Sequence, residues 1–243
     1  MRRAEREALA LALLQGPAEL VPVSSSGHAE ALPWLLGWEI ADWDGARRKS
    51  LGVALHVGTA AALLVVAPPR RPRPALLAAA VGPPALAGWR WQDRIEERLG
   101  TPGTLAAGLL AGGAALVLAD RAPSGRRAED ATLTDGLVLG LAQCTALWPG
   151  VSRSGATLAA ARARGFSRPE ATRLSWEVGL PVMLGAACLR RPAPLACSAV
   201  AFGSTLAAAK TLGFERRGPL WRWAAWRAVL AGAILAVRHN RAR

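Results

Sequence analysis

The sequence predicts an all-α integral membrane protein with about ten helical segments arranged as an inverted-topology repeat. Three observations support this fold class. The 243-residue chain is 52% apolar, and the apolar residues gather into long runs. Of the 30 basic residues all but Lys49 and Lys210 are arginine, and they cluster between the runs, which is typical of loops joining membrane-spanning helices. Two loop motifs also repeat along the chain at one fixed offset.

Ten apolar runs predict the helical segments. Four of them, the first, second, sixth and seventh, have only about 9 to 16 residues, whereas a spanning helix needs about 20. We therefore expect each half to contain one re-entrant helix pair followed by three spans. The runs are Ala8–Val21, Ala29–Trp38, Leu51–Ala67, Ala75–Trp91, Thr104–Ala119, Leu133–Trp148, Gly155–Ala163, Ala171–Leu189, Leu195–Leu212 and Trp221–Val237.

Composition excludes several classes of protein. The net charge of +13 could indicate a nucleic-acid partner, but the arginine pairs separate apolar runs and do not follow one helix face, so we expect none. Cys144, Cys188 and Cys197 lack the CxxC spacing of a zinc site, and their odd number does not fit a disulfide framework. The arginine pairs are Arg2-Arg3, Arg47-Arg48, Arg70-Arg71, Arg126-Arg127, Arg190-Arg191 and Arg216-Arg217.

The loops inside the two short pairs are copies of each other. The first reads PVSSSG over residues 22–27 and the second PGVSRSG over residues 149–155. We expect one membrane domain over residues 1–243, with repeats at approximately 6–120 and 131–240. An odd number of crossings per half inverts the second half and places a site at the pseudo-two-fold axis. An offset of 128 relates Gln15, Val23, Ser24, Ser26 and Gly27 to Gln143, Val151, Ser152, Ser154 and Gly155.

The first motif places a carboxylate at membrane depth. Gln15 and Glu19 are four residues apart and share a helix face, and Glu19 lies in a segment otherwise suited to lipid. Such a carboxylate predicts a functional site, although it could also pair with an arginine simply to hold helices together. The serines at 24–26 could cap the next helix, bind an anion, or do both. His28 follows in the first turn, where either packing or chemistry is compatible with its position.

The second motif places Arg153 where the first has Ser25. A guanidinium suits a phosphate group held by two hydrogen bonds, and the neighbouring Gly150 and Gly155 let the backbone approach an oxyanion. Pairing of Arg153 with Glu19 is the structural alternative. If both loops serve one site, we expect Ser25 and Arg153 to face across a single cavity within roughly 10 Å of each other. That cavity should have a polar floor and open sideways to lipid.

At these motifs the chain resembles a known family. LLQGPAELVPVSSSGH and LAQCTALWPGVSRSGAT are similar to the two signature motifs of the bacitracin-resistance type of undecaprenyl-diphosphate phosphatase. HVGTAAALLVV and FSRPEATRLSWEVGLPVMLGA extend the resemblance over most of the chain. It implies a multi-pass enzyme of the bacterial plasma membrane. Such an enzyme would hydrolyse undecaprenyl diphosphate to the monophosphate and phosphate, recycling the lipid carrier of peptidoglycan synthesis.

The resemblance also implies the site residues. The catalytic set is Glu19, Ser25, His28 and Arg153. A divalent cation, Mg²⁺ or Ca²⁺, bridging Glu19 and the diphosphate is compatible with it, but Gln15 leaves the pair only one carboxylate. Glu177 is a second, unexpected carboxylate in a span. The substrate-binding set is Gln15, Ser24, Ser26, Gly27, Ser152, Ser154, Gly155 and Thr157.

Several alternatives stay open from the sequence. The nucleophile could be Ser25, His28 or water, and the protein could be a monomer or a homodimer among membrane lipids. A lipid phosphatase of the acid-phosphatase type needs a histidine six residues after Arg153, where this chain has Ala159. Inverted repeats are also transporter architecture, so a polyprenyl-phosphate flippase is the alternative function. A purely structural scaffold leaves Glu19, His28 and Arg153 unexplained.

Overall fold

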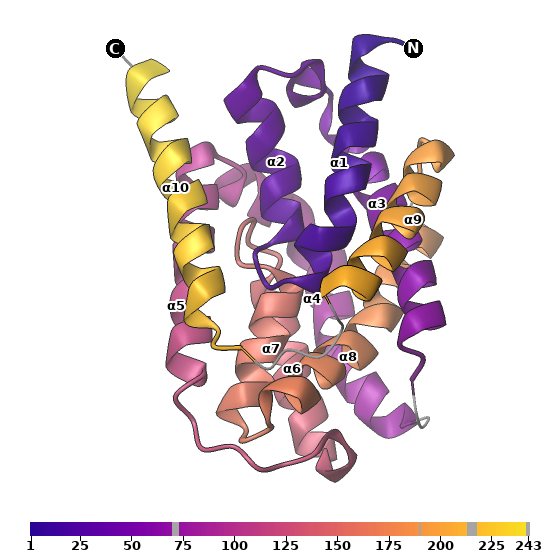
Figure 1. Cartoon of the computed structure of the whole chain (residues 1–243), viewed down its shortest axis with the longest axis vertical. Helices are drawn as coiled ribbons and strands as arrows, with labels where there is room; N and C mark the ends of the chain where they lie inside the picture. Colours follow the sequence, from indigo (N-terminus) through magenta and orange to yellow (C-terminus); the bar gives the residue numbers. More distant parts are fainter. Residues whose placement is uncertain (70–72, 190, 213–217, 242–243) are drawn as a thin grey trace. The chain divides into compact units, whose positions relative to one another are not determined.

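The computed structural model describes residues 1–69, 73–189, 191–212 and 218–241. Within these ranges the chain forms ten α-helices and two short 3-10 helices, with one isolated β-bridge between Arg126 and Phe166 and no β-strand (Figure 1). The all-helical fold class is confirmed. Five arginines of the predicted clusters, at positions 70, 71, 190, 216 and 217, lie outside the described residues.

Each predicted apolar run corresponds to a helix. Three of the four short runs are short helices, α2, α6 and α7, of 12, 13 and 11 residues. The helices are α1 (Arg3–Leu20), α2 (Ser25–Leu36), α3 (Gly45–Val66), α4 (Pro74–Leu99), α5 (Pro102–Ala119), α6 (Leu133–Thr145), α7 (Arg153–Ala163), α8 (Arg168–Leu189), α9 (Leu195–Leu212) and α10 (Trp221–Arg241).

Several helices extend beyond their apolar runs, and α1 and α4 show why. The expectation of a short first segment was wrong, because α1 has 18 residues and already begins at Arg3. Charged residues extend it, and the Arg3 guanidinium contacts the Glu7 carboxylate at 2.9 Å one turn later. At the end of α4, Gln92 donates to Glu96 at 2.8 Å. Charged and amide side chains favour helix and form such i, i+4 pairs, so hydropathy alone misplaces these ends.

Local sequence explains where several helices begin. Thr101 accepts a hydrogen bond from the Thr104 N–H, and Pro102 occupies the first position of α5. Thr132 caps α6 and Asp44 caps α3 in the same way. A hydroxyl or carboxylate at this position satisfies one of the free N–H groups of the first turn.

Within the described ranges three helices, α3, α5 and α9, are long and apolar enough to cross a membrane by length and composition. Several others contain charged residues or internal prolines, as in α1 with Pro17 and α8 with Pro181. Proline removes one helical hydrogen bond, which is tolerated at membrane depth where neighbouring groups compensate.

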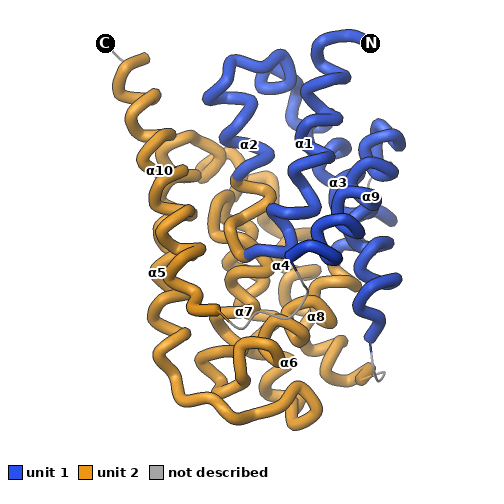
Figure 2. The backbone as a smooth tube through the Cα atoms, viewed as in Figure 1, with its two compact units in different colours: residues 1–21, 28–70, 183–214 blue, residues 22–27, 71–182, 215–243 orange. Residues whose placement is uncertain are grey.

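The described chain divides into two compact units (Figure 2). Unit 1 comprises residues 1–21, 28–70 and 183–214, and in it α9 packs against α1 and α3. Gly16 permits the close approach of α1 and α9, because a Cβ there would lie 2.5 Å from the backbone nitrogen of Thr205. Small residues at such contacts let membrane helices pack closely. One cluster of buried apolar residues in this unit comprises Ala8, Leu11, Ala12, Ile40, Leu51, Ala54, Leu55, Cys197 and Ala201.

Unit 2 comprises residues 22–27, 71–182 and 215–243, and it holds two helix groups. In one group α5 packs against α10 and α7, and Figure 1 shows α5 and α10 side by side. In the other, α6 packs against α4 and α7. Gly136 and Gly140 of α6 lie directly on the α4 backbone, where a Cβ would come within 2.7 Å of the Leu76 carbonyl oxygen or 2.6 Å of the Ala79 carbonyl oxygen.

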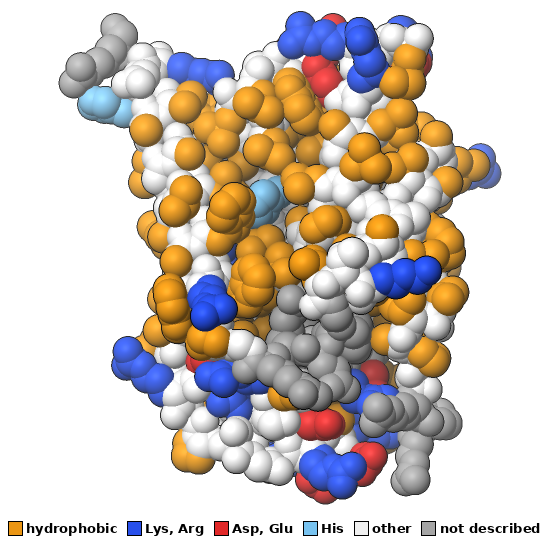
Figure 3. Space-filling view, in the orientation of Figure 1, with side chains coloured by type: hydrophobic (Ala, Val, Ile, Leu, Met, Phe, Trp, Pro, Cys, Tyr) orange, Lys and Arg blue, Asp and Glu red, His pale blue; other side chains and the backbone are white. Residues whose placement is uncertain are grey.

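A charged network joins the loop ends of unit 2. Arg168 donates two hydrogen bonds to the Asp120 carboxylate, at 2.7 and 2.9 Å, and the Leu220 N–H donates a third at 3.1 Å. The Asp135 carboxylate accepts from Arg126 at 2.7 Å and from Arg164 at 2.7 Å. Figure 3 shows basic and acidic side chains gathered at the lower end of the view, and hydrophobic side chains along α10.

Candidate active site

The first loop ends in an unusual backbone conformation at Ser24. Its φ is +73°, in the left-handed region that a residue other than glycine rarely adopts. The Ser24 hydroxyl accepts a hydrogen bond from the Gly27 N–H at 3.1 Å, and α2 begins at the next residue, Ser25. Ser24 is therefore the N-cap of α2, which was one of the roles considered for the serines at 24–26. It turns the chain sharply into the helix.

The second loop has the same geometry at the matched residue. Ser152 has a φ of +74°, and its hydroxyl accepts from the Gly155 N–H at 3.1 Å. The Ser154 hydroxyl lies 3.3 Å from that of Ser152, and Arg153 is the first residue of α7. Each loop thus leads into the first turn of a helix, where free N–H groups and the helix dipole favour an anion.

Arg227 of α10 connects the two loops. Its Nε donates to the Pro22 carbonyl oxygen at 2.8 Å and its Nη1 donates to the Val151 carbonyl oxygen at 2.9 Å. The side chain is fully buried, and no carboxylate among the described residues pairs with it. Its Nη2 is buried without a hydrogen-bond partner, next to Gly155, where a Cβ would lie 2.3 Å away. One guanidinium therefore brings both loops together within unit 2.

The second loop rests on a glycine-lined face of α5. A Cβ at Gly108 would lie 2.2 Å from the Pro149 carbonyl oxygen, and one at Gly112 would lie 2.5 Å from the Val151 carbonyl oxygen. Gly150, with a φ of +94°, makes the turn between those two contacts. Trp148 anchors the start of the loop by donating from Nε1 to the Thr104 carbonyl oxygen at 2.9 Å.

The Arg153 guanidinium lies across α8. Its Cζ is 5.8 Å from the centre of the Trp176 ring, and its Nη1 occupies the space beside Gly179, only 1.6 Å from where a Cβ would be. Behind it, the Thr157 hydroxyl donates to the Arg153 carbonyl oxygen at 2.9 Å and lies 2.6 Å from the Ser175 hydroxyl. Thr157 thus fixes the first turn of α7 from the side of α8.

Unit 1 carries the buried carboxylate of the first motif. Glu19 is 3% exposed and accepts a hydrogen bond from the Gln15 amide at 3.2 Å, as one shared helix face requires. The Nε2 of His56, on α3, lies 3.9 Å from the same carboxylate, and its Nδ1 lies 2.7 Å from the Gly52 carbonyl oxygen. His28 is buried in the first turn of α2. These groups can hold and move protons.

Sequence reasoning missed two of these residues. His56 stands in the HVGTAAALLVV stretch, and Arg227 stands inside the apolar run of the last helix. The available signal was the same in both, an ionisable side chain within a run otherwise fit for lipid.

The model for a family described as "Bacitracin resistance protein BacA" matches residues 8–233. The chain belongs to this family. It is 34% identical over 267 residues to the undecaprenyl-diphosphatase of Pelobacter propionicus, covering 95% of this chain and 96% of that protein. It is 36% identical to the undecaprenyl-diphosphatase of Geobacter sulfurreducens, with coverage of 94% and 96%. Identity to that of Acidiphilium cryptum is also 36%, with coverage of 85% and 83%.

In this BacA-family chain Glu177, whose role the sequence left open, is held by two arginines. Arg73 Nη2 donates to one carboxylate oxygen and Arg173 Nε donates to the other at 3.0 Å. The carboxylate is largely buried, and pairing offsets the cost of burying it. Glu177 therefore joins the start of α4 to α8.

The residues around Glu19 bear on the cation hypothesis. No group of three or more His, Cys, Asp or Glu side chains suited to a metal occurs in the described part of the BacA-family chain. The Gln15 amide lies 3.2 Å and the His56 imidazole 3.9 Å from the Glu19 carboxylate. Mg²⁺ and Ca²⁺ prefer oxygen ligands, so Glu19 is a suitable ligand for such a cation and the His56 imidazole is not.

Proposed function

We propose that this chain is a membrane phosphatase that hydrolyses undecaprenyl diphosphate to undecaprenyl phosphate and inorganic phosphate, recycling the lipid carrier for cell-wall synthesis. Membership of the BacA family and the printed name of its relatives support this reading. The observation that carries it structurally is the pair of matched serine caps, joined by Arg227, with Arg153 at the first residue of α7.

The proposed roles follow from phosphoryl-transfer chemistry. Arg153 and the first-turn N–H groups of α7 bind the phosphate oxygens and stabilise the charge that develops on them. The Ser25 hydroxyl attacks the terminal phosphorus, and the bond from that phosphorus to the bridging oxygen breaks, releasing undecaprenyl phosphate. Water then hydrolyses the phosphoserine to free phosphate.

His28 and Glu19 transfer the protons. His28 is three residues after Ser25 on α2, so the two side chains lie on neighbouring positions of one helix face. Glu19, hydrogen-bonded to Gln15, is a buried carboxylate able to accept a proton. In the alternative route, Ser25 orients a water molecule that attacks directly. A Mg²⁺ or Ca²⁺ ion at Glu19, completed by diphosphate oxygens, would supply further charge neutralisation.

The inverted repeat is part of the proposal. Ser24 and Ser152 have the same φ and the same cap, although 128 residues separate them. In unit 1 the first helix of one half, α1, packs on α9, and in unit 2 the first helix of the other half, α6, packs on α4. When two halves are related by a two-fold axis, the first helix of each half is expected to pack on the fourth helix of the other half. The short helices α2, α6 and α7 are compatible with re-entrant pairs.

The setting is the bacterial inner membrane. We propose a multi-pass protein forming one membrane domain over residues 1–243, with α3, α5 and α9 among its spans. Its partners are then the polyprenyl diphosphate substrate and membrane lipids. A homodimer stays a prediction, which the mass of the purified protein in detergent would test.

Phosphate release tests the function directly. Purified protein in detergent should release phosphate from undecaprenyl diphosphate with no second compartment, whereas a flippase would release none.

Glu19→Ala, His28→Ala and Arg153→Ala should each lower the rate of phosphate release by about 100-fold or more, because each removes an acid–base or charge-stabilising group. Glu129→Ala, at an exposed position in a short 3-10 helix, is the control. Near-native turnover in two of the three variants would contradict the site.

A further inference from the structure

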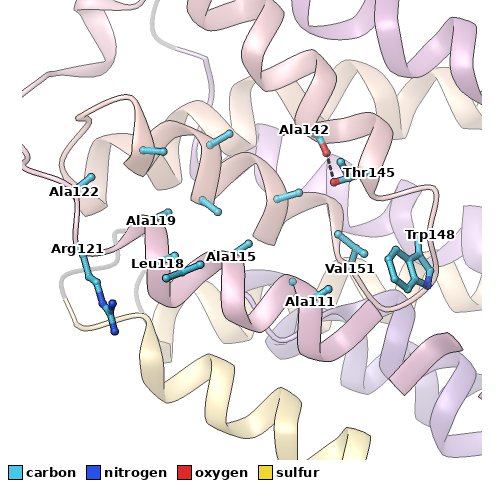
Figure 4. A pocket seen from close by; sticks show the side chains of 15 residues that line it. Ala111, Ala115, Leu118, Ala119, Arg121, Ala122, Ala142, Thr145, Trp148 and Val151 are labelled. Carbon is cyan, nitrogen blue, oxygen red and sulfur yellow. Dashed lines mark hydrogen bonds between the residues drawn. The ribbon is translucent and has the colours of Figure 1, made fainter. Parts of the chain in front are cut away.

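An apolar groove runs along the second loop in unit 2. It has a volume of about 880 Å³ and lies between α5 and α7, with α6 contributing to one wall. Figure 4 shows Trp148 and Val151 at one end and Arg121 and Ala122 at the other. The groove is therefore not the polar-floored cavity expected for the head group. It is a separate feature that begins at the loop carrying Ser152 and Arg153.

Alanines create the groove. On α5, Ala111, Ala115 and Ala119 stand four residues apart and form one wall, as Figure 4 shows. On α7, Ala156 and Ala160 form the facing wall with the same spacing. Side chains four apart lie above one another on a helix, so two facing rows of methyl groups leave a furrow between the helices. From Ala111 to Ala119 its length is about 12 Å at 1.5 Å per residue.

The α7 alanines of this groove have no alanine counterparts in the first half of the repeat. At the offset of 128, Ala156, Ala160 and Ala163 of α7 correspond to His28, Leu32 and Leu35 of α2. Larger side chains at those positions would fill such a furrow. The alanine wall on α7 is therefore specific to the second half, which also carries Arg153.

We propose that this groove binds the first isoprene units of the substrate's own chain. The proposal rests on the proposed function, because its occupant is the lipid part of a prenyl diphosphate. Three features favour this occupant. The lining is apolar, the groove opens along its side, and its inner end is continuous with the phosphate-binding loop, since Val151 directly precedes Ser152 and Ala156 follows Arg153 by one turn.

The geometry limits how much of the chain is recognised. A furrow of about 12 Å accommodates only the beginning of an undecaprenyl chain, so the remainder must stay in the bilayer. Each isoprene unit that contacts the groove wall adds a small dispersion energy, so the gain increases with the length of chain in contact. The affinity for the substrate should therefore increase when the chain is lengthened from dimethylallyl to farnesyl. It should change little between farnesyl and undecaprenyl.

Filling the groove tests the proposal. Ala160→Leu introduces the residue that α2 has at the matched position, and Ala115→Leu narrows the opposite wall. For farnesyl and undecaprenyl diphosphate we expect each variant to lower kcat/KM by about 10-fold, mainly through KM. Dimethylallyl diphosphate should be hydrolysed at an unchanged rate. The matched control is Ala114→Leu, because Ala114 is exposed on α5 outside the groove. This variant should leave kcat/KM unchanged for all three substrates.

Labelling gives a second readout that does not depend on turnover. In an Ala160→Cys variant, farnesyl phosphate should slow maleimide modification of residue 160, measured on the isolated peptide, and dimethylallyl phosphate should not. Cysteine is close to alanine in size, so this variant covers the case in which Ala160→Leu fails to fold. An Ala114→Cys variant should show no protection.

The outcomes separate the two proposals. Absence of phosphate release from every prenyl diphosphate by the unmodified protein would overturn the proposed function. Normal release with equal losses on short and long substrates, or equal effects of Ala114→Leu, would overturn the groove alone. Protection of residue 160 by phosphatidylcholine as strong as that by farnesyl phosphate would also overturn it, because the groove would then be a general lipid contact.

Discussion

The backbone conformations of Ser24 and Ser152 determine where α2 and α7 begin. A left-handed φ costs a residue other than glycine on the order of 1 kcal/mol, and residues held in such conformations cluster at functional sites. Here each hydroxyl offsets part of that cost by accepting the N–H of a glycine three residues later. The result is an abrupt start of the helix at Ser25 or Arg153, so the proposed nucleophile and the proposed phosphate-binding arginine each occupy a first turn.

The two adjacent serines of the first loop should therefore behave differently. Ser25→Ala should abolish phosphate release, because it removes the proposed nucleophile. Ser24→Gly keeps the left-handed turn and loses only the cap, so we expect most activity to remain and at most about 1 kcal/mol of stability to be lost. Steady-state rates and thermal unfolding in detergent measure the two effects. Equal, mild losses in both variants would point to attack by water or His28.

Arg227 should act as a positioning residue, through the shape of its guanidinium as well as its charge. Lysine keeps the charge but concentrates its donors at one point, so it cannot span the Pro22 and Val151 carbonyl oxygens as arginine does. We expect Arg227→Lys to lower kcat by about 10-fold or more with a smaller change in KM. Arg222→Lys, on the exposed side of the same helix, is the control. Near-native kcat in Arg227→Lys would show that charge alone suffices.

At the scale of elements, glycines on α5 and α8 make room for the second loop. Gly108 and Gly112 admit the Pro149 and Val151 carbonyls against α5, and Gly179 leaves space on α8 for the Arg153 guanidinium. Glycine has a low helix propensity, so these residues do not stabilise the helices themselves. They allow a backbone or a cation to approach where any Cβ would intervene.

Gly179→Val should consequently impair catalysis more than folding. The new side chain would overlap the Arg153 guanidinium, which can swing away because it is the end of a flexible chain. We expect turnover to fall by about 10-fold or more and thermal stability to change little. The matched control is Gly185→Val on the same helix, because a Cβ at Gly185 meets nothing within 4 Å. A large loss of stability with unchanged turnover of the folded fraction would contradict this role of Gly179.

At the scale of the whole molecule, ion pairs between loops matter as well as helix packing. Asp120, just after α5, contacts Arg168 at the start of α8 and the N–H of Leu220 just before α10. Burial acts to raise the pKa of the Asp120 carboxyl, but these hydrogen bonds outweigh it and hold the pKa below the ordinary value. Asp120 thus links three distant parts of unit 2 through one carboxylate.

This link predicts a dependence of stability on pH. Because the folded pKa of Asp120 is lower than the unfolded value of about 4, its contribution is present above that value and is lost as pH falls through the folded pKa. Thermal unfolding in detergent should therefore shift to lower temperature on acidification, and less so in Asp120→Asn, which carries no titrating group there. The exposed Glu129→Gln variant should follow the unmodified protein. Identical profiles for Asp120→Asn and the unmodified protein would refute the assignment.

The sequence by itself determined the ten helices, the motif residues and the family resemblance. Apolar runs and caps are local signals, and the repeated VSxSG is visible without coordinates, so α2, α6 and α7 were recognisable as short helices. Hydropathy failed at the ends of α1 and α4, where charged residues continue the helix through i, i+4 pairs.

Only the tertiary structure decided which distant residues meet. Arg227 is 76 residues from Val151 and 205 from Pro22, and nothing local in the sequence indicates that its guanidinium joins their carbonyls. The same holds for His56 beside Glu19, Arg73 beside Glu177, and the groove between α5 and α7. Such contacts depend on how helix faces pack, and packing is set by the sum of many small, non-local contacts that no single stretch of sequence encodes.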